Sequence, residues 1–141
     1  MLTVKDKKFY LNGEEFKIHS GSLHYFRALP EYWEDLLIKI KAAGFNCVET
    51  YTCWNLHEPH KGVFNFEGML DLERFIETAD KIGLKVILRT GPFICAEWEN
   101  GGLPAWLLKD PSIRLRCNAE PYITHLHDWF KVLLAKIKPY L

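Results

Sequence analysis

Strand-like and helix-like hydrophobic patterns alternate three times along this sequence, and no other feature restricts its fold as strongly. Each of three short strand-like runs is followed by a longer segment with apolar side chains at helical spacing. Three consecutive strand–helix units with apolar strands predict a parallel sheet covered by helices. The pattern predicts strands over 18–25, 47–54 and 85–89, and helices over 31–43, 71–82 and about 118–138.

A β-hairpin is expected before the first of these units. Asn12-Gly13 separates two short strand-like runs, and this dipeptide readily adopts the positive φ angles that a two-residue hairpin turn demands. We therefore expect residues 1–17 to form a peripheral hairpin flap, and residues 18–141 to form the main α/β unit.

Sequence motifs distinguish nucleotide-binding α/β folds from α/β barrels. No Gly-x-Gly-x-x-Gly motif follows the first strand and no phosphate-binding Gly-Lys-Ser is present, which disfavours the nucleotide-binding doubly wound folds. A (β/α)₈ TIM barrel is the better prediction, and it places chemistry at the carboxyl ends of the strands. A whole barrel needs about 250 residues and eight units. The 141 residues are therefore expected to form about the first three units of a barrel.

Charge and hydropathy narrow the choice of partners. The chain has 18 Lys and Arg against 18 Asp and Glu, which disfavours nucleic acid or an anionic membrane as the main partner. No apolar run approaches the roughly 20 residues that span a bilayer. The first residues lack the apolar core of a signal peptide, so we expect a cytoplasmic protein.

Neither a cofactor nor a metal ion is expected from the motifs. The four cysteines form no Cys-x-x-Cys pair, and we expect them to be reduced, buried and small hydrophobic residues. His57 and His60 are three residues apart, but no third ligand accompanies them, so a metal site is disfavoured. His125 and His127 are expected on the surface of the last helix.

Carboxylates, amides and aromatic rings gather where the second and third strands end. Residues 49–59 and 89–102 both carry this mixture. Carboxylates and amides hydrogen-bond hydroxyl groups, and aromatic rings stack on the C–H face of a sugar ring. Together they suit a neutral ligand with many hydroxyl groups.

Individual residues at these ends have more than one interpretation. For Glu58, a role in function and a role as a solvated loop charge are equally supported. The position of Glu97 directly after a strand favours a role in function. Strand alternation points Tyr51 and Glu49 to the same side. Arg89 is expected to have a carboxylate partner, because an isolated buried charge is costly, and its role remains open between structure and catalysis.

The segment 101–108 indicates a scaffold. Gly101-Gly102 suits a tight turn before a short helix, in which Trp106 and the neighbouring leucines anchor the loop that carries Glu97.

The two strand ends resemble a known family. Tyr51-Thr-Cys-Trp-Asn-Leu-His-Glu-Pro59 and Gly91-Pro-Phe-Ile-Cys-Ala-Glu-Trp-Glu-Asn-Gly-Gly-Leu-Pro-Ala-Trp-Leu-Leu108 closely resemble β-galactosidases of glycoside hydrolase family 35, as does His24-Tyr-Phe-Arg27. The resemblance covers essentially the whole chain. The sequence departs from the family at a few positions. Thr52-Cys53 stands where the family often has Val-Pro, and Thr90 stands where it often has Pro. Phe93 stands where Tyr is frequent, and this last difference removes a hydroxyl group from the loop.

The resemblance implies a retaining exo-glycosidase that removes terminal β-linked galactose. It implies that Glu97 accepts hydrogen bonds from sugar hydroxyls and does not attack carbon. Cys95 and Ala96 would contribute mainly backbone groups. The implied galactose-binding residues are Tyr51, Cys95, Ala96 and Glu97, with Arg89, Glu58, Trp54 and Phe93 as candidate supporting residues.

The resemblance also implies where catalysis takes place. Retention needs two carboxyl groups about 5–5.5 Å apart. In the family, the acid/base belongs to an Asn-Glu pair ending the fourth strand, and the nucleophile ends the seventh. The sequence contains no Asn-Glu dipeptide, so we expect no catalytic residue among its positions and no activity of this segment alone.

Two alternative functions remain open. The first is a related barrel glycosidase for another β-linked sugar. The second is a non-catalytic fragment that binds sugar or another protein. In either case the unpaired strand edges predict self-association of the isolated chain.

Overall fold

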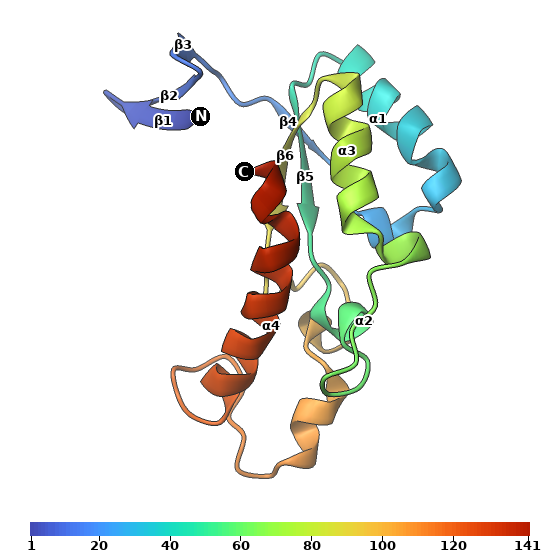
Figure 1. Ribbon diagram of the computed structural model, residues 1–141, viewed down its shortest axis with the longest axis vertical. Helices are drawn as coiled ribbons and strands as arrows, with labels where there is room; N and C mark the ends of the chain where they lie inside the picture. The colour runs from blue at the N-terminus through green and yellow to red at the C-terminus, as the bar shows by residue number, and fades with distance from the viewer.

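The computed structural model describes all 141 residues and contains two separate three-stranded sheets (Figure 1). One sheet is antiparallel and the other is parallel, and each has its strands in chain order. The antiparallel sheet comprises β1 (Leu2–Lys5), β2 (Lys8–Leu11) and β3 (Glu14–Glu15). The parallel sheet comprises β4 (Ser20–Ser22), β5 (Cys47–Tyr51) and β6 (Lys85–Arg89).

Four α-helices and several short 3₁₀ helices connect and cover the strands. The α-helices are α1 (Trp33–Ala42), α2 (Trp54–His57), α3 (Leu72–Ile82) and α4 (Tyr122–Ile137). The 3₁₀ helices are η1 (Tyr25–Arg27), η2 (Pro30–Tyr32), η3 (Gly68–Leu70), η4 (Glu99–Gly102), η5 (Ala105–Lys109) and η6 (Lys138–Tyr140). None of the helices combines the length and apolar character needed to cross a membrane.

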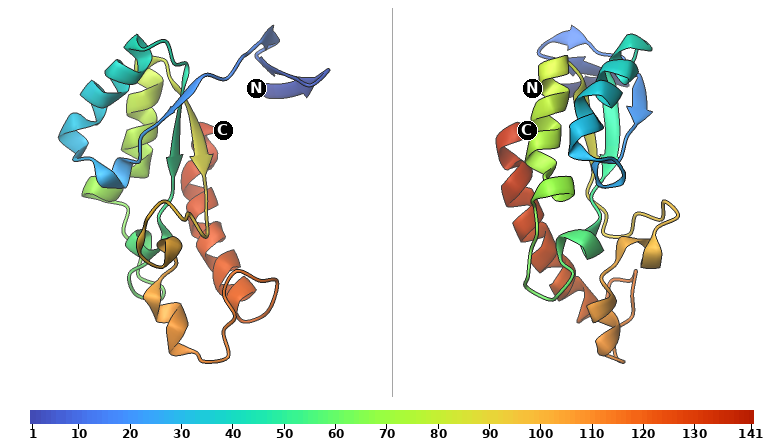
Figure 2. Two further views of the ribbon diagram at one scale, coloured as in Figure 1. Left: turned by 180° about the vertical axis from the view of Figure 1, so that it is seen from behind. Right: turned by 90° about the vertical axis from the view of Figure 1, so that its right-hand side faces the viewer.

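The amino-terminal sheet confirms the expected hairpin and adds a second one. Asn12 and Gly13 have φ angles of 54° and 92° between β2 and β3. The turn between β1 and β2 also uses positive φ angles, of 50° at Asp6 and 62° at Lys7. Asp-Lys is not a typical turn dipeptide of this kind, which is why the sequence pattern does not indicate this hairpin. The sheet projects from the end of the molecule opposite to the carboxyl ends of β5 and β6 (Figures 1 and 2).

The parallel sheet confirms the predicted alternation of strands and helices. In β5, Glu49 lies opposite Ile87 of β6, and Tyr51 lies opposite Arg89. The helix α3 begins and ends where its sequence signals indicate. The Asp71 carboxylate accepts a hydrogen bond from the Arg74 backbone at 3.0 Å, and Gly83 ends the helix at a φ of 81°.

The two faces of the parallel sheet differ. The helices α1 and α3 pack together over one face (Figure 1). The Trp33 and Phe75 rings meet edge to face between them, at 5.5 Å from centre to centre. Val48 and Thr50 of β5 are fully buried. The helix α4 runs beside α3, to which an ion pair between Lys136 and Glu73 joins it at 2.7 Å. Since side chains alternate along a strand, Glu49 and Tyr51 lie on the other face.

Three predicted boundaries are wrong. The first strand is limited to β4 because the chain turns at His24 into η1, which buries Tyr25 and Phe26. The second strand ends at Tyr51, and its last expected residue instead begins α2. The last helix begins at Tyr122, after Pro121, and not near Asn118. There the Glu120 carboxylate accepts a hydrogen bond from the Thr124 backbone at 3.2 Å.

The cysteines follow the prediction only in part. All four are free thiols, and Cys47 and Cys53 are buried as expected. Cys95 is exposed and Cys117 is partly exposed, because both lie in the long loop between β6 and α4. The prediction that every cysteine is a buried hydrophobic residue is therefore wrong for Cys95 and Cys117.

Candidate functional site

A polar cluster occupies the carboxyl end of the parallel sheet. Glu49 of β5 accepts hydrogen bonds from Ser22 of β4 at 2.6 Å and from Arg89 of β6 at 3.3 Å. Arg89 also donates a hydrogen bond to the Tyr51 hydroxyl, and its guanidinium carbon lies 4.2 Å from the centre of the Tyr51 ring. The predicted carboxylate partner of Arg89 is thus Glu49, and the prediction that Glu49 and Tyr51 point the same way is confirmed.

His24 lies beside this cluster. Its ring is 5.0 Å from the Tyr51 ring and 5.6 Å from the Phe26 ring, centre to centre. Desolvation lowers the pKa of His24, although the nearby Glu49 carboxylate acts in the opposite direction. The Nδ1 atom is buried without a hydrogen-bond partner. His24 therefore places an unsatisfied polar atom next to the cluster.

The loop after β6 contains a left-handed turn of three consecutive non-glycine residues. Cys95, Ala96 and Glu97 have φ angles of 58°, 51° and 47°. Residues other than glycine rarely adopt this conformation, and strain of this kind is concentrated at functional sites. The Trp98 backbone amide closes the turn by donating to the Cys95 carbonyl at 3.0 Å.

Contacts from η1 and α2 hold this turn in place. Arg27 donates a hydrogen bond to the Ala96 carbonyl, and its guanidinium carbon lies 5.1 Å from the centre of the Trp98 ring. The Trp98 indole in turn donates to the Asn55 side chain at 3.2 Å. The Phe26 and Trp98 rings meet edge to face at 5.1 Å. Together with His24, these rings connect the turn to the cluster around Tyr51.

The turn presents a free carboxylate. Glu97 is exposed, and its carboxylate makes no hydrogen bond or ion pair within the chain. Cys95 is also exposed, whereas Ala96 is half-buried and uses its carbonyl to bind Arg27. The turn is therefore held rigidly by its neighbours while the Glu97 side chain remains available to a ligand.

Glu58 has a different environment from the one expected for a loop charge. It is only 4% exposed, and its carboxylate accepts hydrogen bonds from the Trp54 indole at 2.6 Å and from the Gly62 backbone at 2.8 Å. Its carbonyl accepts another from the Trp106 indole at 2.9 Å. The interpretation of Glu58 as a solvated charge is therefore wrong, and its contacts are structural.

Trp54 is also an internal residue and not a ring at the surface of the site. It is fully buried between the Trp129 ring, stacked at 6.0 Å, and the Trp106 ring, which it meets edge to face at 5.9 Å. Trp106 thereby anchors the loop after β6 to the segment after β5, which confirms the scaffold predicted for 101–108. Trp106 also contacts His125, whose ring it meets edge to face at 5.2 Å from centre to centre. His125 is therefore half-buried and not the surface residue that was expected.

His57 completes the buried layer beneath the strand ends. Its Nε2 and the Tyr25 hydroxyl are 2.5 Å apart, and its Nδ1 lies 2.8 Å from the Asn65 carbonyl. Burial lowers the pKa of His57 to about 4, although the hydrogen bond to Asn65 opposes this shift. A neutral ring with an Nδ1–H donor and an Nε2 acceptor satisfies both contacts. Because both nitrogens are engaged, His57 has no atom left for a metal ion.

Phe93 closes the base of the loop. Gly101 lies so close that a Cβ atom at this position would be 1.9 Å from the Phe93 ring. The Arg116 guanidinium carbon lies 3.9 Å above the same ring. These contacts give Phe93 a role in shaping the loop that carries Glu97.

The sequence pattern did not indicate the role of Arg27 or the pairing of Tyr25 with His57. Arg27 is separated from Ala96 by 69 positions, and Tyr25 from His57 by 32. No local periodicity links residues this far apart. One signal was nevertheless available for Arg27, because a cation directly after two aromatic residues at a strand end is unusual in a core segment.

Comparison with solved structures supports the fold. An exo-beta-1,4-mannosidase from Opitutaceae bacterium strain TAV5 superposes with a TM-score of 0.69 at 19% sequence identity, over 98% of this chain and 25% of that one. A GH5_18 protein from Streptomyces cattleya superposes with a TM-score of 0.64 at 17% identity, over 85% of this chain and 30% of that one. The α/β arrangement with a parallel sheet therefore matches a part of the TIM-barrel fold of GH5 glycosidases.

Comparison with protein sequences gives the family. A beta-galactosidase of Bos taurus is 50% identical over 99% of this chain, and beta-galactosidase 17 of Arabidopsis thaliana is 47% identical over 98%. The chain covers 21% and 20% of these two relatives, so it spans about a fifth of their length. The model of glycosyl hydrolases family 35 matches residues 8–141. The chain therefore belongs to glycosyl hydrolases family 35.

Proposed function

We propose that this chain supplies the galactose-binding part of a retaining β-galactosidase site. The observation that carries the proposal is the left-handed turn 95–97, which keeps the Glu97 carboxylate free while Arg27 holds the turn in place. An ionised carboxylate at a rigid position accepts hydrogen bonds from sugar hydroxyls without first losing an internal partner. The identity of about 50% to beta-galactosidases supports galactose as the sugar.

The polar cluster at β5 and β6 would form the floor of this site. The Tyr51 hydroxyl is oriented by Arg89, which is itself held by Glu49. Donors and acceptors that are fixed in advance cost less entropy when a ligand binds. We propose that Tyr51 binds a sugar hydroxyl, and that Arg89 and Glu49 position it.

The proposal assigns no catalytic residue to this chain. The parallel strands β4, β5 and β6 would be the first three of eight in a (β/α)₈ barrel, preceded by the hairpin of residues 1–17. Retention needs a nucleophile and an acid/base about 5–5.5 Å apart. Glu58 is unsuited to either role because its carboxylate already accepts two internal hydrogen bonds. Both catalytic glutamates would then come from other strands of the barrel.

Binding by the 141-residue chain tests this proposal. We expect saturable binding of methyl β-D-galactoside in a calorimetric or NMR titration, together with no hydrolysis of an aryl β-galactoside. Glu97→Gln replaces one charged acceptor and should weaken binding by about tenfold. Glu99→Gln is the matched control, because Glu99 is also exposed and lies two positions away.

The outcomes separate the alternatives. Tighter binding of a β-glucoside or β-mannoside than of the galactoside would replace galactose by another β-linked sugar. Equal loss of affinity in Glu97→Gln and Glu99→Gln would remove Glu97 from the site. Hydrolysis by the chain alone would contradict the assignment of catalysis to other strands.

A further inference from the structure

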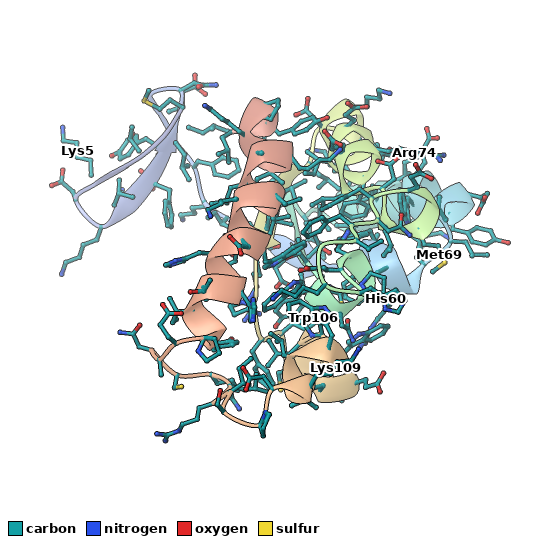
Figure 3. All side chains as sticks on the ribbon, turned by 60° about the horizontal axis from the view of Figure 1, so that its bottom comes forward. Lys5, His60, Met69, Arg74, Trp106 and Lys109 are labelled. Atoms are coloured by element: carbon teal, nitrogen blue, oxygen red, sulfur yellow. The ribbon has the colours of Figure 1, made fainter.

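A hollow of about 430 Å³ lies on the outer side of the segment after β5, away from the polar cluster. It is formed where the loop after Glu58, the helix η5 and the first turn of α4 meet. Figure 3 shows three of its residues, His60, Trp106 and Lys109, on the face turned toward the viewer. The volume falls within the range of small-molecule sites, which is about 300–1,000 Å³. The residues that matter for its chemistry are His60, Lys61, Trp106, Lys109, Asp110 and His125.

The charges around the hollow favour an anion. Lys61 and Lys109 are both exposed, and neither takes part in any ion pair or side-chain hydrogen bond of the chain. The imidazole rings of His60 and His125 can add N–H donors. Lys8, Lys39 and Lys131 each pair with a carboxylate, whereas the ammonium groups of Lys61 and Lys109 are both free to bind a ligand at the same hollow.

The acidic groups nearby already have partners. One oxygen of Asp110 accepts hydrogen bonds from the Ser112 backbone at 2.9 Å and from the Ser112 hydroxyl at 2.6 Å. Asp128 interacts electrostatically with Lys61 and His125, but it forms its ion pair with Lys131, at 2.9 Å. The neutral Ser112 donors do not cancel the charge of Asp110, so the lining of the hollow has two free ammonium groups against one carboxylate.

An aromatic ring gives the hollow an apolar wall of fixed orientation. The Trp106 indole donates to the Glu58 carbonyl at 2.9 Å, and its ring packs edge to face against His125 and Trp54. Ile113 adds an aliphatic surface. A ring that is already immobilised loses little conformational entropy when a ligand stacks on it.

We propose that this hollow binds an acidic saccharide, that is, a pyranose bearing a carboxylate or a sulfate group. The Trp106 ring contacts the C–H face of the sugar, and Lys61 and Lys109 bind the anionic group. The hollow is distinct from the proposed galactose site, because none of Tyr51, Cys95, Ala96 and Glu97 lines it.

Titration of the full chain with three probes tests the proposal. The probes are methyl β-D-glucuronide, its neutral analogue methyl β-D-glucoside, and inorganic sulfate. We expect the glucuronide to bind at least about tenfold more tightly than either of the others, because only it combines ring contact with a charge-assisted hydrogen bond. An NMR titration should also shift the Trp106 indole signal.

Charge-matched variants locate the site. Lys61→Met combined with Lys109→Met should weaken glucuronide binding by about tenfold or more. Lys5→Met combined with Lys39→Met removes the same charge from exposed positions elsewhere and should leave the affinity nearly unchanged. Glu97→Gln should also leave it unchanged, which separates this site from the proposed galactose site.

Three results would overturn the proposal. Equal binding of the glucuronide and the glucoside would show that the lysines do not select an anion. Sulfate binding as tight as glucuronide binding would show a simple anion site with no saccharide contact. Binding that both lysine pairs weaken equally, or no binding at millimolar concentrations, would remove the site altogether.

Discussion

Glu58 and Glu97 occupy similar places in the sequence and opposite environments in the structure. Each lies in the segment that follows a strand of the parallel sheet, within four positions of a tryptophan and an asparagine. Glu58 is 4% exposed and accepts two hydrogen bonds, whereas Glu97 is exposed and accepts none. A position after a strand therefore does not decide whether a carboxylate acts on a ligand.

The backbone after each strand accounts for the difference. After β5 the chain forms α2, which brings Glu58 within reach of Trp54 one helical turn earlier. After β6 it forms the left-handed turn 95–97, which leaves Glu97 without an internal donor. In the first segment, local donors satisfy the Glu58 carboxylate, which supports the fold. The second segment is strained and depends on Arg27 for support.

Removal of the two carboxylates should show the largest contrast. Glu58→Ala leaves the buried Trp54 indole without an acceptor and removes the acceptor of the Gly62 amide, and it should lower the free energy of unfolding by about 3 kcal/mol. Glu97→Ala should change it by no more than about 0.5 kcal/mol. Urea unfolding of both variants measures the difference. Similar losses in both would show that Glu97 also has a structural partner.

The stability of the protein should fall in acid because His57 becomes protonated. Because burial lowers the pKa of His57 from 6.5 to about 4, the unfolded state binds a proton at a higher pH than the folded state does. The stability that His57 contributes is therefore complete above pH 6.5 and is lost as the pH falls toward 4. The loss is at most about 3.5 kcal/mol, since one pKa unit corresponds to about 1.4 kcal/mol.

The His57→Phe variant should lack this part of the pH dependence. Its Tyr25 hydroxyl loses an acceptor, which lowers stability at every pH but does not affect the slope. His127→Phe serves as the control on the exposed surface of α4. The measurement is the free energy of unfolding of each variant between pH 7 and 4. If the stability of His57→Phe fell with pH as steeply as that of the unmodified chain, His57 would not be the source of the pH dependence.

The elements that the sequence predicted well are those with local signals. The helix α3 has an N-cap at Asp71 and a left-handed glycine at Gly83, and the strand β6 spans the predicted 85–89. The clustering of Glu49, Tyr51 and Arg89 also followed from strand alternation and from the rule that parallel strands share an edge.

The environments of the loop residues could not be predicted in the same way. Cys95, Ala96 and Glu97 have no intrinsic preference for positive φ, so their turn arises from contacts with Arg27 and Asn55 that are distant in sequence. The burial of Glu58 depends partly on Trp106, which is 48 positions away. Only its spacing of four from Trp54 offered a local indication.

The loop that carries Glu97 should tolerate no side chain at Gly101. A Cβ atom there would lie 1.9 Å from the Phe93 ring, at a φ of 59°. Gly101→Ala should therefore cost about 2–3 kcal/mol from steric overlap and backbone strain together. Gly62→Ala, at a φ of 77° with nothing within 4 Å, should cost only the strain, about 1 kcal/mol.

Thermal unfolding of these variants distinguishes overlap from strain. Combining Gly101→Ala with Phe93→Leu should restore part of the lost stability, because the smaller side chain vacates the space that the Cβ atom needs. If Gly101→Ala and Gly62→Ala cost the same, the close packing of Phe93 against Gly101 is not present in solution.

The smallest effect should have the opposite sign. Ala96→Gly relieves the left-handed strain at a φ of 51° and should raise the free energy of unfolding by up to about 1 kcal/mol. Ala135→Gly, at an exposed interior position of α4, should lower it by about 1 kcal/mol. The same substitution therefore stabilises the turn and destabilises the helix.

This pair of variants also tests whether the strain serves ligand binding. Glycine widens the conformations open to residue 96, so the turn holds Glu97 less firmly and affinity for methyl β-D-galactoside should fall while stability rises. The Ala135→Gly variant should keep its affinity despite its lower stability. A loss of stability in Ala96→Gly equal to that in Ala135→Gly would mean that the turn is not left-handed in solution, and the main structural contrast between Glu97 and Glu58 would then disappear.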